Sequence, residues 1–257
     1  MITTKRIITC FVDLFFLWVL FKFGLGGCES AILLTKTFAP LSWLLLGGVV
    51  FLLFFRSDYQ MDVPIFFTGL LLGYWGEWWG TTRGVWWYWN SAMPPDYLPP
   101  LWGLGVLTVY RLSQLLMPRM PSDLSRNQVI ILGSSFMLLP VLAIARSIDV
   151  LATLDWSSWL DFHFFAGLII GLLLIIYQFD LRRDVLIYLC GTLLGGLYEY
   201  LGTSVGEWTY ASGETPPLWI APLWGLAAVA MVSLAEILRK FTRNSWSRIK
   251  KWQKLRF

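Results

Sequence analysis

Two glutamates occupy matching places in two copies of one motif, and their type and position suit acid chemistry. Glu77 and Glu199 lie 122 positions apart, each near the C-terminal end of a predicted membrane helix. The helix dipole and the low dielectric there both disfavour the charged form of a carboxylate. Both residues are therefore candidate catalytic acids or proton sites. The alternative is structural, with each glutamate hydrogen-bonded to the Gly-Thr pair that follows it.

Three aromatic residues follow each glutamate at fixed spacing. They are Trp86, Tyr88 and Trp102 in the first copy and Trp208, Tyr210 and Trp224 in the second. We expect these six to form the walls of a substrate-binding site, because aromatic faces stabilise a cation such as one made by protonating an alkene. An interfacial aromatic belt is the alternative, but a belt needs no fixed register with a glutamate.

Glycines precede each glutamate at helical spacing. Gly69 and Gly73 lie eight and four residues before Glu77, and Gly191 and Gly195 repeat this before Glu199. Residues four apart share a helix face, and glycines on that face let a second helix approach closely. We predict that these four glycines are helix-packing residues and that each carboxylate faces a neighbouring helix.

The motif is part of a longer duplication. Residues 58–104 align without a gap on 180–226, and 21 of the 47 positions are identical. The copies also differ, since Arg83 has Val205 as its counterpart and Glu207 has Val85. Two similar carboxylates in unlike surroundings could hold different protonation states.

Composition places these copies in a membrane. Hydrophobic residues make up 57% of the 257-residue chain, only 14% are charged, and the mean hydropathy is +0.62. We predict an all-α integral membrane fold with eight spans, each close to the length that crosses a bilayer. The predicted spans are 7–26, 39–55, 63–80, 100–117, 128–146, 160–178, 184–202 and 218–238. In the loops before the third and seventh spans, Asp62 and Asp184 are predicted helix N-caps.

Lysine and arginine set the orientation. With the N-terminus inside, most basic residues fall in inner segments, whereas the outer loops hold only Lys36, Arg83 and Arg146. We therefore expect a bacterial inner-membrane protein with both termini cytoplasmic. Four spans per copy make the repeats parallel, related by a pseudo-twofold axis. The predicted domains are repeat one (1–120), repeat two (121–238) and a basic tail (239–257).

The tail and the remaining reactive residues predict little further chemistry. The tail has eight basic and no acidic residues, which favours either an amphipathic helix on anionic lipid or the ordinary basic excess on the inner side of a last span, and both over nucleic-acid binding. Three scattered cysteines and one histidine, His163, indicate no metal site. Asp161 beside His163 leaves a proton relay as the alternative to a packing role. Cys28 follows a lipoprotein-like Leu-Gly-Gly run, but charges in the preceding stretch favour a retained helix. No nucleotide or other cofactor motif is present.

The second copy carries a family resemblance. Residues 199–224 combine Glu-x2-Gly-x3-Gly-x-Trp-x-Tyr with Pro-Leu-Trp-Ile-Ala-Pro-Leu-Trp. They resemble an uncharacterised family of small bacterial multi-pass membrane proteins. The order of features is also similar to integral-membrane lycopene cyclase domains and carotenoid hydratases, which implies acid-initiated chemistry on isoprenoids. The cyclase pattern has paired glutamates where this chain has Leu101-Trp102 and Leu223-Trp224.

Three functions follow as hypotheses. The first is binding of a lipid-like molecule, such as an isoprenoid, in an outer-leaflet cavity at the repeat interface, with modification by acid catalysis. The second is ion- or proton-coupled transport of a small solute along that interface. The third is a non-catalytic assembly protein whose tryptophan-rich loops dock a protein partner. Membrane lipid is the one partner common to all three.

Overall fold

The computed structural model describes residues 4–25, 39–119, 125–128, 131, 134, 138 and 158–254. The described chain is mostly helical, as the sequence predicts. Its helices are α1 (Thr4–Val19), α3 (Ala39–Phe54), α4 (Tyr59–Thr82), α5 (Leu98–Leu116), α8 (Trp159–Tyr177), α9 (Leu181–Ser204) and α10 (Ile220–Lys254). A π-helical segment, η1 (Leu20–Leu25), continues α1, and a 3-10 turn, η2 (Met117–Arg119), ends α5. Two short strands, β1 (Trp86–Tyr88) and β2 (Trp208–Tyr210), complete the described elements.

Among the described residues, four helices are long and apolar enough to cross a membrane. They cover Thr4–Gly24, Trp159–Tyr177, Leu181–Ser204 and Ile220–Arg243. The apolar helix at 43–54 is shorter. The predicted spans at 63–80 and 100–117 coincide with α4 and α5. These two helices are long enough but not apolar enough to count among the four. The fifth predicted span, 128–146, falls largely outside the described residues.

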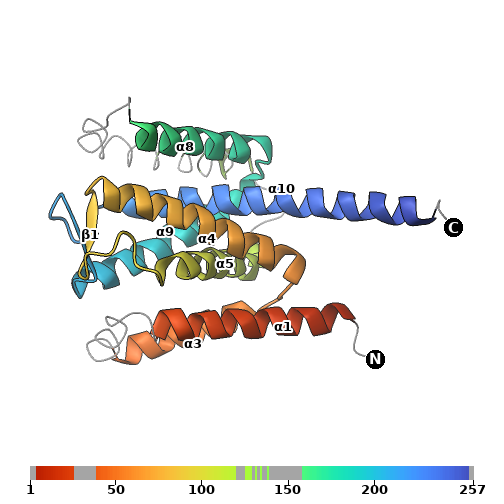
Figure 1. The fold of residues 1–257 in the computed structure, drawn as a ribbon, viewed down its shortest axis with the longest axis horizontal. Helices are drawn as coiled ribbons and strands as arrows, with labels where there is room; N and C mark the ends of the chain where they lie inside the picture. Colours follow the sequence, from red (N-terminus) through yellow and green to blue (C-terminus); the bar gives the residue numbers. More distant parts are fainter. Residues whose placement is uncertain are drawn as a thin grey trace.

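Four helices form the centre of the bundle. α4 packs along α5 and α9 along α10, and the two pairs meet through contacts of α4 with α10 and of α5 with α9. Ile65, Leu107, Ile187 and Val229 come from these four helices and are fully buried. α1 and α3 lie on one side of this core, and α8 lies on the other (Figure 1). The most apolar and most exposed helices are thus the peripheral ones, as expected where the surroundings are lipid.

The two ends of the bundle are different. β1 and the loops around it lie at one end, and both termini lie at the other (Figure 1). At the terminal end, α4 starts four residues and α9 three residues before its predicted span. Their N-caps are therefore Asp58 and Asp180, and the prediction of Asp62 and Asp184 as N-caps is wrong. Each of these two acids lies in the first turn and accepts a hydrogen bond from the N-cap backbone N–H, at 2.6 and 2.8 Å.

The last helix is much longer than a membrane span. α10 has 35 residues, which corresponds to roughly 52 Å at the α-helical rise, against a hydrocarbon thickness of about 30 Å. The basic tail is helical through Lys254 and continues the last span without a break. It extends past the rest of the bundle along the helix axis (Figure 1). A continuous helix of this kind carries the basic residues away from the bundle instead of turning at residue 239.

Candidate functional site

The Glu77 carboxylate accepts three hydrogen bonds from the aromatic residues that the sequence singled out. Trp86 Nε1 and Tyr88 Oη donate to Oε2 at 2.9 and 2.8 Å, and Trp102 Nε1 donates to Oε1 at 2.9 Å. The donors come from β1 and from the first turns of α5. One carboxylate thus connects the end of its own helix, the following strand and the next helix.

Glu199 repeats this arrangement. Trp208 Nε1 and Tyr210 Oη donate to its Oε2 at 2.9 and 2.7 Å, and Trp224 Nε1 donates to its Oε1 at 2.8 Å. Each contact uses the same atoms as its counterpart in the first copy, and the lengths agree within 0.1 Å. The spacing shared by the two sequence copies therefore corresponds to one three-donor carboxylate site built twice.

A tight reversal at each helix end brings the strand back onto the glutamate. Val85 N donates to Gly80 O at 2.8 Å after α4, and Glu207 N donates to Gly202 O at 3.0 Å after α9. The residue that turns the chain is glycine in both copies, with φ of +64° at Gly84 and +73° at Gly206. Because a side chain strains this left-handed conformation, glycine is the residue suited to the turn.

Glycines also make room for the indole rings. A Cβ on Gly73 would lie 2.2 Å from Cγ of Trp102, and one on Gly195 would lie 2.4 Å from Cγ of Trp224. One turn earlier, Gly69 and Gly191 lie against the backbones of α5 and α10, where a Cβ would meet a glycine Cα at 3.0 Å. The four glycines thus sit at close helix contacts, and two of them seat the tryptophans that bind the carboxylates.

The two copies contact each other through reciprocal pairs, in which the tryptophan of each strand lies opposite the tyrosine of the other. β1 and β2 pair antiparallel, with Trp86 opposite Tyr210 and Tyr88 opposite Trp208. The rings of these pairs lie 5.9 and 6.0 Å apart. Such a register is what a local twofold axis through the central strand pair produces. The two carboxylate sites therefore form one aromatic cluster at a single end of the bundle.

Two further tryptophans meet on the same local axis. Trp102 and Trp224 are counterparts in the two copies, and their rings stack 3.8 Å apart with planes inclined by 6°. Each of these rings donates its Nε1–H to the glutamate of its own copy. The stack therefore links the two carboxylate sites through van der Waals contact between their donors.

Both carboxylates are buried, and the groups that donate hydrogen bonds to them are neutral. Glu77 is 7% exposed and Glu199 is 5% exposed. Burial, followed by the charge of its partner glutamate, raises the pKa of Tyr88 and of Tyr210 well above the ordinary value of a phenol. Both phenols therefore remain hydrogen-bond donors throughout the physiological range. A carboxylate has about four acceptor positions, so three donors leave one position open on each.

The chain matches no protein-family model, no curated protein and no solved structure. The family resemblance drawn from residues 199–224 therefore stays a prediction.

Two apolar pockets lie between helices of the bundle, and neither is lined by the glutamates or their six aromatic partners. The larger, of about 340 Å³, lies between α1 and α4. The smaller, of about 240 Å³, lies between α4, α8 and α10 and has His163 as its one titratable lining residue. The structure thus brings the eight predicted site residues together as carboxylates and donors, whereas the described pockets lie elsewhere.

Sequence reasoning missed two contacts that involve charged residues present in only one copy. Asp161 is fully buried and accepts from Arg83 Nε at 2.8 Å, Arg83 Nη2 at 2.5 Å and Trp79 Nε1 at 2.9 Å, which ties α8 to α4. Glu207 accepts a hydrogen bond from the Tyr97 hydroxyl of the other copy. The signal was visible, because Arg83 and Glu207 each replace a valine of the other repeat. The sequence could not say which distant residues would face them.

Proposed function

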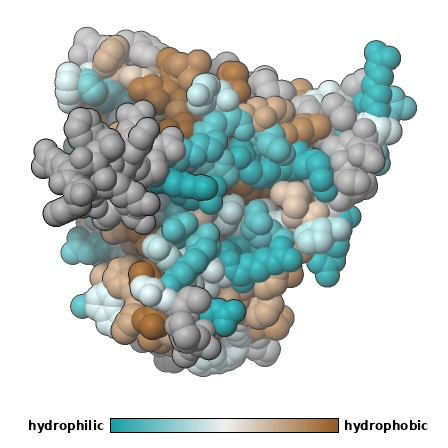
Figure 2. All heavy atoms as spheres, turned by 90° about the vertical axis from the view of Figure 1, so that its right-hand side faces the viewer, coloured by the Kyte–Doolittle hydropathy of each residue, from teal (hydrophilic) through white to brown (hydrophobic). Residues whose placement is uncertain are grey.

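We propose that this chain is a multi-pass inner-membrane protein that binds a lipid-like molecule, such as an isoprenoid, within the bilayer. In this proposal eight spans form two parallel four-span repeats, and both termini are cytoplasmic. Antiparallel pairing of β1 with β2 supports the parallel relation, because it puts both glutamate loops at one end of the bundle. Hydrophilic residues gather across the centre of the opposite, terminal end (Figure 2), which suits the cytoplasmic face of such a protein.

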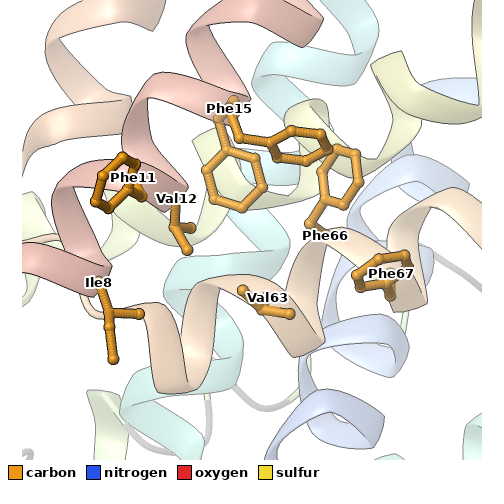
Figure 3. Close-up of a pocket in the computed structure, with 8 residues that line it drawn as sticks. Ile8, Phe11, Val12, Phe15, Val63, Phe66 and Phe67 are labelled. Atoms are coloured by element: carbon orange, nitrogen blue, oxygen red, sulfur yellow. The ribbon is translucent and has the colours of Figure 1, made fainter. Parts of the chain in front are cut away.

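The observation that carries ligand binding is the pocket between α1 and α4. Its volume of about 340 Å³ falls within the range of small-molecule sites. The lining consists of Ile8, Phe11, Val12, Phe15, Phe16, Val63, Phe66 and Phe67, so it offers no polar side chain (Figure 3). A molecule that fits this lining presents hydrocarbon alone to it. Burial of that hydrocarbon against rigid aromatic rings is the favourable contribution.

Access to this pocket is from the side of the bundle. Phe11 is 68% exposed and Phe67 is 50% exposed, so the pocket is bordered by side chains that face outward. Deeper in, Phe16 and Phe66 are almost fully buried, with ring centroids 5.1 Å apart. A chain entering from the lipid would therefore pass the exposed outer rings and end against the buried pair of Phe16 and Phe66.

The position of the carboxylates favours binding over acid catalysis. Phe67 lies ten residues before Glu77 on α4, which is roughly 15 Å along the helix. Each glutamate already accepts three hydrogen bonds from neutral donors. We therefore assign Glu77 and Glu199 the role of holding α4, α5, α9 and α10 together, and these helices support the pocket. Acid catalysis on the bound molecule is the narrower form of the proposal.

The test is mass spectrometry of lipids that remain bound to the purified full-length protein. Val63→Trp fills the pocket with an indole, whereas Leu71→Trp adds the same ring at a 61% exposed position of the same helix. We expect wild type and Leu71→Trp to retain one apolar molecule and Val63→Trp to lose it. Equal retention by Val63→Trp, or no apolar molecule in the wild type, would refute the proposal. For the narrower form, Glu77→Gln with Glu199→Gln should leave the bound molecule chemically unprocessed.

A further inference from the structure

A second group of buried charges lies near the terminal end of the bundle, far from the two glutamates. It contains Asp13 on α1, Asp62 on α4 and Arg111 on α5, with exposures of 6%, 1% and 2%. The group thus has two carboxylates and one guanidinium. Ionisable residues within membrane-crossing helices are costly, so such a group is a functional-site hypothesis by default.

The hydrogen bonds show which acid the arginine compensates. Arg111 Nη2 donates to Asp62 Oδ1, and Nη1 donates to the carbonyl oxygen of Arg56. The other oxygen of Asp62 accepts from the backbone N–H of Asp58 at 2.6 Å. Asp62 therefore has a cationic partner and a partner for each oxygen.

Asp13 is the acid left over. Its carboxyl lies beside the Ser57 side chain and within electrostatic reach of Arg111 and Asp62. Its Oδ1 is buried and has no hydrogen-bond partner among the described residues. The two neighbouring charges oppose each other, because Arg111 attracts an anion at this place and Asp62 repels it. An ionised Asp13 would thus be a buried charge without an ion-pair partner among the described residues, which is strongly unfavourable.

The second repeat has a different set of charged partners at the matching position. Asp184, the counterpart of Asp62, accepts from Arg183 Nε at 2.6 Å, and the same guanidinium donates to Glu236 at 2.5 Å and to the Gln178 carbonyl at 2.9 Å. Ser233 occupies the place of Arg111. Here each guanidinium nitrogen has a partner. The open carboxyl oxygen is therefore a property of the first repeat's group and not of the shared motif.

We propose that Asp13 is a proton-binding site at the interface of α1, α4 and α5, with the Asp62–Arg111 ion pair as its fixed neighbour. A proton on Asp13 removes the uncompensated charge, whereas Arg111 stays engaged with Asp62. A metal ion fits less well, because no group of three or more His, Cys, Asp or Glu residues within the described part of the chain could hold one. This inference is independent of the lipid-binding proposal.

Infrared spectroscopy of the full-length protein in nanodiscs tests it. All protonated carboxylic acids contribute a carbonyl stretch at low pH, so each variant is compared with the wild type by difference spectra. The component lost in Asp13→Asn should titrate at a higher pH than the component lost in Asp58→Asn. Asp58 is the matched control, because it is a partly exposed acid paired with Lys5 and its side chain makes no capping hydrogen bond. Two components that titrate at the same pH would overturn the proposal.

Stability provides a second readout with a definite sign. A proton bound by the folded protein stabilises it at low pH, and that contribution is lost as the pH rises. The midpoint of thermal unfolding should therefore fall with rising pH in the wild type and fall less in Asp13→Asn. If Asp13→Asn does not fold, Ser57→Ala replaces it, because loss of the neighbouring hydroxyl should shift both the frequency and the titration midpoint of the Asp13 band. An unshifted band in Ser57→Ala, or equal pH dependence in Asp13→Asn and wild type, would count against the site.

Discussion

Glutamine at position 199 gives the sharpest test of the carboxylate sites. The amide has the shape of the carboxylate, and its oxygen can still accept from Trp208 and Tyr210. Its NH₂ group then faces Trp224 Nε1, which donates to Oε1 of the wild-type carboxylate at 2.8 Å. Two donors confront each other, and a buried N–H is left without an acceptor. The alternative flip of the amide is worse, because it opposes two donors instead of one.

The expected cost follows from these three contacts. Hydrogen bonds between membrane helices contribute about 0.6 kcal/mol on average and up to about 1.7 kcal/mol. An unmade hydrogen bond of a buried donor costs about 1–3 kcal/mol. Removing the negative charge from a buried site is favourable and offsets part of this loss of stability. We therefore expect Glu199→Gln to lower the free energy of unfolding by about 2–3 kcal/mol, with most of the loss arising at Trp224.

A double-mutant cycle with Trp224→Phe isolates the interaction energy between the side chain at position 199 and the Trp224 N–H. In the glutamine background the Trp224 N–H has no acceptor, so its removal should cost about 1–2 kcal/mol less than in the wild type. Denaturation in detergent can be followed by thiol labelling of Cys190, which is 3% exposed on the same helix, after Cys10→Ser and Cys28→Ser. Tyr200→Phe, at a 53% exposed position, is the control and should be neutral. Additive effects of Glu199→Gln and Trp224→Phe, within about 0.5 kcal/mol, would refute the reasoning.

Two more predictions follow from the same cluster. Gly195→Ala places a Cβ 2.4 Å from Trp224 and should destabilise by about 1–3 kcal/mol, whereas Gly76→Ala meets nothing within 4 Å and should be neutral or stabilising by up to about 1 kcal/mol, both measured by the same unfolding assay. Tyr88 and Tyr210 have folded pKa values above their unfolded ones, so their contribution to stability is present below the unfolded pKa and is lost as pH rises. Between about pH 9 and 11 the tyrosinate absorbance of the folded protein should therefore be the same with and without Tyr88→Phe and Tyr210→Phe; a smaller rise in the variant would contradict this.

The sequence allowed the components of the carboxylate sites to be predicted, because the duplication repeats them in register. Glu77, Trp86, Tyr88 and Trp102 recur at fixed spacing in a background where leucine and glycine alone would match by chance. Helical spacing then placed the glycines on the face that packs. What spacing could not give is the role of the aromatic residues, because a wall and a hydrogen-bond donor use the same residue types.

The long-range contacts were beyond sequence reasoning for a physical reason. The exchange of Trp86 and Tyr210 depends on how two loops meet in space, not on the order of residues within either loop. Likewise Asp13 gained significance only when α1 packed beside Arg111, which lies 98 positions away in the chain. A charged residue in an apolar run signals a polar environment in the folded protein, but identifying the residues that form it requires the fold.

The exchange of partners between β1 and β2 has an evolutionary consequence. Trp86 of the first copy contacts Tyr210 of the second, and the equivalent residues Trp208 and Tyr88 make the same contact. Such reciprocal contacts are those of an isologous dimer. A half-length chain with the same motif could form the strand pair and the Trp102–Trp224 type of stack with a second copy of itself. In such a dimer every substitution appears twice. A single chain that holds both copies is free of that constraint, so residues around the shared centre can differ between the copies, as Val85 and Glu207 do.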